Sequence, residues 1–124
     1  MRQRGMTLLE VLVSLLLFSF GVLGMVGMQA RAVQYSVDAE DRSKAAVIAN
    51  EVVTSMWGQG SLTVPAATIT ALETRARDRL AGGLPAAATI AVTAASGVAT
   101  VTITWPAKRA SDPDRNYFTQ VAMP

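Results

Sequence analysis

The chain has 124 residues, of which 51% are hydrophobic and 16% charged, and it contains no cysteine and no histidine. It therefore lacks the thiolates and imidazoles that serve most zinc sites and most nucleophilic active sites. We expect a protein that is not an enzyme and has no cofactor. The net charge of +2 depends on Arg2 and Arg4, because the other nine basic side chains equal the nine acidic ones, which argues against nucleic acid as a partner.

The N-terminal third predicts a membrane anchor. After the basic residues 1–5, an apolar run extends from Met6 to Met28 with Glu10 as its one formal charge. This run is long enough to cross a hydrocarbon core of about 30 Å. The arginines before it place the N-terminus in the cytoplasm by the positive-inside rule. We predict a single transmembrane helix over residues 6–28.

The segment Gly5-Met6-Thr7-Leu8-Leu9-Glu10-Val11 resembles the processing motif of type IV prepilins and secretion pseudopilins. In that motif a basic leader ends in glycine, an apolar residue follows, and a glutamate comes after three more residues. The resemblance implies that residues 1–5 are a leader, and that a prepilin peptidase and N-methyltransferase cuts between Gly5 and Met6. Most members have phenylalanine where this chain has Met6, which is also apolar.

Glu10 has two interpretations that can both hold. A carboxylate inside a membrane span costs about 2.5–3.5 kcal/mol on insertion scales, so its presence needs a reason. Thr7-x-x-Glu10 has the spacing of a capping box at the start of a helix. The resemblance implies instead an assembly role, in which Glu10 pairs with the amino terminus of a neighbouring subunit. We favour the second, because an ionisable residue at membrane depth is a functional candidate by default.

Three glycines in the span, Gly21, Gly24 and Gly27, each lower helix propensity by about 0.8–1.0 kcal/mol relative to alanine. Small residues allow close packing against another membrane helix. The alternative is a segment that bends or unwinds during assembly. The sequence favours neither.

Beyond the span, apolar residues recur at helical spacing as far as Trp57, which predicts one helix from Met6 to Trp57 with an amphipathic half over residues 29–57. Gly58-Gln59-Gly60 is expected to end it. Asp38–Arg42 and Glu40–Lys44 are i,i+4 pairs expected on its solvated face. The apolar positions are Val33, Val37, Ala45, Ile48, Val52 and Met56.

Residues 58–124 predict a small head with one more helix. Ala71 to Leu80 has helical spacing with Leu72, Ala76 and Leu80 inward, and Gly82-Gly83 and Pro85 after its end. Its three arginines, Arg75, Arg77 and Arg79, alternate with Ala76 and Asp78 and have no aromatic residue beside them. We expect an ordinary exposed face here and not a DNA contact.

The end of the head predicts an antiparallel sheet. Ala88–Thr93 and Val98–Trp105 alternate as strands across an Ala95-Ser96-Gly97 turn, and residues 116–123 form a less regular third strand after a charged loop over 108–115. One face of the second strand carries Val101, Ile103 and Trp105, which we expect to pack inward.

Together these elements predict an α+β, type IV pilin-like fold, in which a long N-terminal helix packs on a small antiparallel sheet. The glycine-rich stretch from Ser19 to Gln29, with Arg42, Ala45-Ala46 and Ala49-Asn50-Glu51, resembles the PilV (type IV pilus modification protein) branch of minor pilins over residues 1–57. This implies a protein of the bacterial inner membrane with a periplasmic head, which joins other minor pilins and the major pilin and reaches the pilus at the cell surface. A minor pseudopilin of type II secretion, a DNA-binding competence pilin and a simple anchored periplasmic protein are the alternatives.

Overall fold

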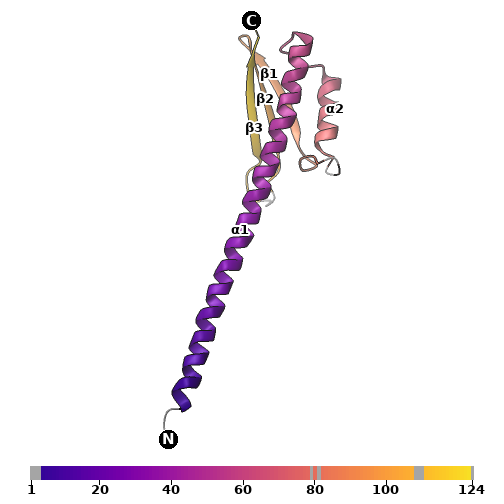
Figure 1. The fold of residues 1–124 in the computed structure, drawn as a ribbon. Coiled ribbons are helices and arrows are strands. Elements are labelled where there is room, and N and C mark those ends of the chain that lie inside the picture. Colours follow the sequence, from indigo (N-terminus) through magenta and orange to yellow (C-terminus); the bar gives the residue numbers. More distant parts are fainter. Residues whose placement is uncertain (1–3, 79, 81, 108–110, 124) are drawn as a thin grey trace. The chain divides into compact units, whose positions relative to one another are not determined.

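The computed structural model describes residues 4–78, 80, 82–107 and 111–123 (Figure 1). It contains the helices α1 (Arg4–Gln59) and α2 (Ala66–Ala76), followed by the strands β1 (Thr89–Ala95), β2 (Val98–Trp105) and β3 (Arg115–Ala122). Contacts divide the chain into two compact units, residues 1–38 and 39–124. We call the second unit the head. The long apolar helix and the small antiparallel sheet confirm the predicted α+β class.

The long helix is continuous, as predicted, and extends two residues beyond the expected range at each end. Gly60 terminates it with a φ of +60°, which glycine adopts without the steric penalty of a Cβ. The N–H of Gly60 donates to the carbonyl of Trp57, and the N–H of Ser61 donates to that of Met56, both at 3.2 Å. These two bonds form a Schellman motif, which satisfies carbonyl groups left free at the helix end.

The sheet is an antiparallel meander in the order β1-β2-β3. Ala95 pairs with Val98 across a two-residue turn, and both turn residues, Ser96 (φ 52°) and Gly97 (φ 76°), have positive φ. Turns of this kind match the twist of the strands they join. The predicted third strand is confirmed as β3, which pairs with β2 along its whole length.

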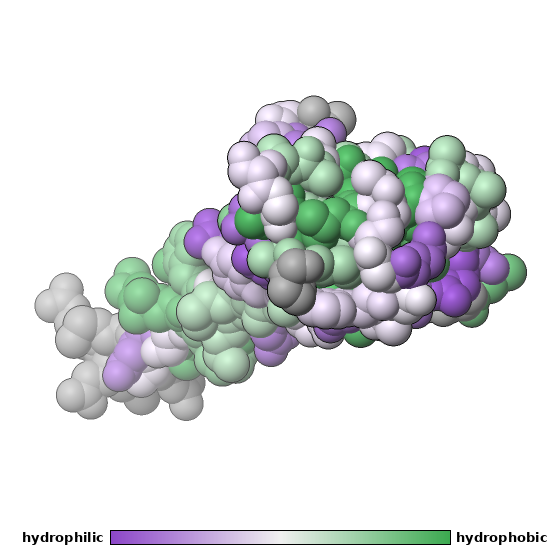
Figure 2. Space-filling view, turned by 90° about the horizontal axis from the view of Figure 1, so that it is seen from above, coloured by the Kyte–Doolittle hydropathy of each residue, from purple (hydrophilic) through white to green (hydrophobic). Residues whose placement is uncertain are grey.

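The core of the head lies between the sheet and residues 39–59 of α1. On the helix, Ala45, Ala49, Val52 and Met56 are fully buried, spaced three or four residues apart as one helical face requires. The sheet contributes six inward residues of β2 and its neighbours to the same cluster, together with Leu84 from the connection before β1. Seen from above, a group of hydrophobic residues is visible in the middle of the view, with hydrophilic and hydrophobic residues mixed around it (Figure 2). The sheet residues are Ile90, Ala99, Val101, Ile103 and Val121, with Trp105 at the end of β2.

The prediction for the second helix was wrong in its limits. It begins at Ala66, directly after Pro65, and ends at Ala76, so Leu80 lies outside the helix and is fully exposed. Leu72 and Ala76 do face inward as expected, with Ala76 buried and Leu72 packed against the core. The leucine that packs inward in this region is Leu84, which is fully buried, and not Leu80 as predicted.

On α1, one predicted ion pair is present, but the predicted division into apolar and solvated faces fails at two residues. Lys44 and Glu40 form the expected ion pair at 2.8 Å. Val33, expected on the apolar side, is 63% exposed, whereas Asp41 is 8% exposed and thus buried. The apolar positions that pack inside the head therefore begin at Ala45.

Candidate functional site

Among the described residues, the first unit contains residues 4–38 of α1 and no second element against which their apolar side chains could pack. Large hydrophobic side chains over residues 8–28 are exposed, from 43% at Val22 to 69% at Phe18. The helix is long and apolar enough to cross a membrane by length and composition. Such exposure in water is unfavourable by about 25 cal/mol per Å² of apolar surface. The surface therefore suits a lipid or protein environment.

Glu10 lies on this apolar stretch and is exposed. Because α1 already begins at Arg4, Thr7 is inside the helix and the first turn carries no acidic residue. The capping-box interpretation is therefore wrong for the chain as it stands. Further along the same stretch, the hydroxyl Oγ of Ser19 donates to the carbonyl of Leu15 at 2.7 Å, which satisfies it within the helix.

The three glycines of the span leave one side of the helix bare. A Cβ at Gly21, Gly24 or Gly27 would meet no atom within 4 Å, and the helix continues through all three. Gly24 and Gly27 line a shallow hollow together with Met28 and Arg31. Nothing within this unit requires glycine at these positions, so the bent or unwound alternative and the packing alternative both remain predictions about an assembled state.

Comparison with known families finds a match at the N-terminal end of the chain. Residues 1–26 match the family described as the prokaryotic N-terminal methylation motif. The chain carries the N-methylation motif of prepilin-like proteins. Comparison with curated proteins finds no match, and comparison with solved structures finds none.

The methylation motif includes the predicted processing residues Gly5 and Met6, the carboxylate Glu10, and two of the three glycines, Gly21 and Gly24. Gly27 lies one residue beyond the match. The motif and the apolar helix fit a membrane anchor at the N-terminus. Its family covers proteins that are cut by prepilin peptidase before they assemble.

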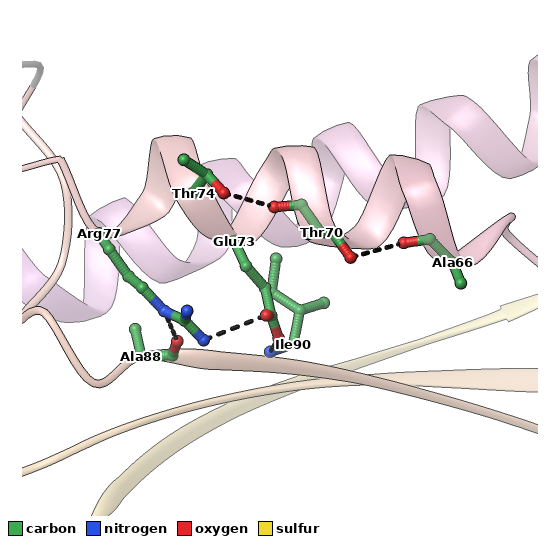
Figure 3. A network of polar contacts seen from close by, with 7 residues as sticks. All are labelled: Ala66, Thr70, Glu73, Thr74, Arg77, Ala88 and Ile90. Carbon is green, nitrogen blue, oxygen red and sulfur yellow. Dashed lines mark hydrogen bonds and ion pairs between the residues drawn. The ribbon is translucent and has the colours of Figure 1, made fainter.

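The head contains polar contacts that sequence reasoning missed. Arg77 was expected on an exposed face, but its Nε donates to the carbonyl of Ala88 at 2.7 Å, and its guanidinium pairs with Glu73 at 3.1 Å. The other oxygen of Glu73 accepts the N–H of Ile90 at 2.8 Å. Figure 3 shows the side chains of Glu73, in α2, and Arg77, just after the end of α2, reaching to the start of β1. Only the i,i+4 spacing of Glu73 and Arg77 could have indicated a pair.

Arg75 pairs with Glu51 of α1 and so joins α2 to the long helix. Beside this pair the head is hollowed by a cavity of about 250 Å³ whose lining includes Lys44, Ile48 and Gly83. Two of the three arginines considered for a DNA contact are thus engaged within the protein, while Arg79 lies outside the described residues. This weakens further the case for a nucleic-acid surface on α2.

Proposed function

We propose that this chain is a minor type IV pilin of the PilV kind, anchored in the bacterial inner membrane and built into the minor-pilin complex that starts a pilus. The observation that carries the proposal is the methylation motif over residues 1–26. It overlaps the start of an apolar helix whose large hydrophobic side chains over residues 8–28 are exposed. A helix of this kind is insoluble as a monomer and needs a membrane first and other helices later.

The proposed maturation is cleavage between Gly5 and Met6 by prepilin peptidase, which also methylates the new amino terminus. In the uncut chain this bond lies near the beginning of α1. Cleavage moves the start of the helix to Met6 and places Glu10 four residues from the new terminus. A carboxylate close to a helix N-terminus is favoured by the macrodipole, so processing improves the surroundings of Glu10.

The proposed role of Glu10 is to receive the positive amine of a neighbouring subunit. Its own amine is one helical turn away, about 6 Å along the axis, so a contact within one chain competes with the contact between chains. In a membrane each of the two charges is unfavourable alone. If they pair across subunits, this free-energy cost is relieved only when the subunits assemble. The partners are other minor pilins and the major pilin, with the head on the periplasmic side and later at the cell surface.

One strain with the Glu10→Ala substitution tests the proposal against a matched Ser19→Ala strain. Both proteins should be cut after Gly5 and stay in the membrane fraction, as N-terminal mass analysis and fractionation would show. Glu10→Ala should fail to co-purify with the other minor pilins, whereas Ser19→Ala should not, because that hydroxyl is satisfied within its own helix. Normal recovery of partners with Glu10→Ala would refute the pairing role. An uncut leader in a peptidase-competent strain would refute the pilin assignment itself.

A further inference from the structure

The two edges of the sheet differ in what contacts their outward backbone N–H and C=O groups. At the β1 edge, one side chain of α2 and one of the residue after it take the place of a further strand: Glu73 accepts the N–H of Ile90, and Arg77 donates to the carbonyl of Ala88 (Figure 3). These bonds satisfy the outward backbone groups where β1 begins. At the other edge, β3 has β2 as its one strand neighbour among the described residues.

The outward backbone groups of β3 follow from the register. Antiparallel residues direct their N–H and C=O to one side, and successive residues alternate. The backbone N–H of Ile90 points away from β2, because it donates to Glu73. Its neighbours Thr89 and Ala91 therefore form the backbone hydrogen bonds to β2, at Thr104 and Thr102. This leaves Val101 and Ile103 to bond to β3 at Thr119 and Tyr117. The outward residues of β3 are therefore Asn116, Phe118, Gln120 and Ala122.

The open edge also lacks the features that discourage pairing with other chains. Proteins usually protect an edge strand with proline, lysine, a bulge or short length. β3 has eight residues, and from Asn116 to Ala122 it contains no charge, proline or glycine. Phe118 on its outer face is 65% exposed. The absence of charge makes this edge unsuited to a ligand held by ion pairs.

We propose that the outer edge of β3 is a strand-addition site, which binds an extended and uncharged segment of another protein. Only an extended backbone offers donors and acceptors at the two-residue repeat of Asn116, Phe118, Gln120 and Ala122. The inward residues of that segment should be apolar, because on β3 they would lie beside Tyr117 and Val121, which pack against and within the core. Phe118 offers an apolar contact on the opposite face.

A second copy of the chain fits this edge less well than a separate segment. Within the head, β3 and residues 39–59 of α1 run in the same direction (Figure 1). Two-fold pairing of β3 with β3 is antiparallel, so it would reverse the helix of the second head relative to the first. Chains that all enter their heads from one side of a membrane share a single direction. The preference against a second copy rests on the membrane anchor of the proposed function, whereas the strand-addition site itself does not.

The test uses the full chain in detergent and a synthetic peptide that copies residues 98–105, flanked by lysines for solubility. This is the sequence of β2, which already pairs with β3 in the head. Binding should slow hydrogen exchange of the Phe118 and Gln120 amides by about tenfold or more. A peptide N-methylated at alternate residues, which removes the donors of one edge, should give no protection.

Gln120→Pro and Ala94→Pro form a matched pair of variants. By the register above, both positions direct their N–H away from β2, so proline removes no bond of the existing ladder. Gln120→Pro should abolish peptide binding, whereas Ala94→Pro on the β1 edge should retain it. Equal binding by Gln120→Pro, or equal protection by the N-methylated peptide, would overturn the proposal. So would a dimer whose β3 amides are protected before any peptide is added. If Gln120→Pro does not fold, the comparison of the two peptides decides alone.

Discussion

Residues 4–38 and the head differ in the exposure of their large apolar side chains. In the first unit the large apolar side chains from Leu8 to Met28 are exposed. In the head, Met56, Leu84 and Ile103 are fully buried against one another. The first unit is therefore a surface that needs surroundings outside the chain, whereas the second satisfies its own hydrophobic demand.

This difference shows which residues serve assembly and which serve stability. A substitution in the head changes the free energy of folding of the unit that contains it. A substitution in residues 4–38 changes what the helix meets in a membrane or another helix, with little effect on the head. Four changes can break or sharpen this distinction.

The largest effect is expected from removing residues 1–28. The remaining chain, residues 29–124, should be soluble without detergent and monomeric, because the exposed apolar stretch is gone while the head core is retained. Size-exclusion chromatography and circular dichroism check this, the latter showing both helix and strand. A disordered product would show that the head depends on the segment removed.

Leu84→Ala should lower the free energy of unfolding of the head by about 2–5 kcal/mol, because a fully buried leucine leaves a cavity. Leu16→Ala, at 56% exposure, is the matched control and should change it by less than about 0.5 kcal/mol. Denaturant unfolding of the full chain in detergent, followed by the fluorescence of buried Trp105, measures both. Equal losses in the two variants would refute the separation.

Gly83→Ala should destabilise the head by about 1–3 kcal/mol, in the range for overpacking. A Cβ at this position would collide with the carbonyl oxygen of Ala76 and lie 2.7 Å from that of Asp78. Gly24→Ala meets open space and should leave the head unchanged while it favours the helix by up to about 1 kcal/mol. Thermal unfolding of the two variants side by side gives the comparison.

Glu73→Ala should cost about 1–3 kcal/mol, because it removes the acceptor for the N–H of Ile90 and the ion-pair partner of Arg77. Glu40→Ala breaks an exposed pair within one helix and should cost about 0.5 kcal/mol or less. Urea titration resolves the difference. Faster hydrogen exchange at Ile90 should accompany the first variant alone.

Local patterns predicted the elements that depend on local physics. The unbroken helix follows from its apolar and amphipathic spacing, and its end from Gly60. The β1–β2 hairpin follows from alternation on either side of Ser96 and Gly97, whose short turn sets the register so that Val101 and Ile103 face inward. In the candidate site, the motif around Gly5 and Glu10 could be predicted because all its residues are close together in the sequence.

The parts that sequence reasoning missed depend on residues far apart in the chain. The start of α2 had a local sign in Pro65, but the alanine-rich sequence after it defines no strong apolar face. The roles of Arg75 and Arg77 need partners 24 and 11 residues away, Glu51 and Ala88. Leu84 enters the core from outside any of the predicted elements. No contact within the described residues explains the three glycines of the span, so their role stays a prediction.

The long separation in sequence between α1 and β3 bears on when the head can close during synthesis. Val121 of β3 belongs to the same core as Met56 of α1. The ribosome therefore makes the apolar face of α1 long before it makes the strand that helps to cover that face. At roughly 5–20 residues per second, the interval between these two residues lasts about 3–13 s. During that time the newly made Ala45–Met56 face is exposed to chaperones and to other nascent chains.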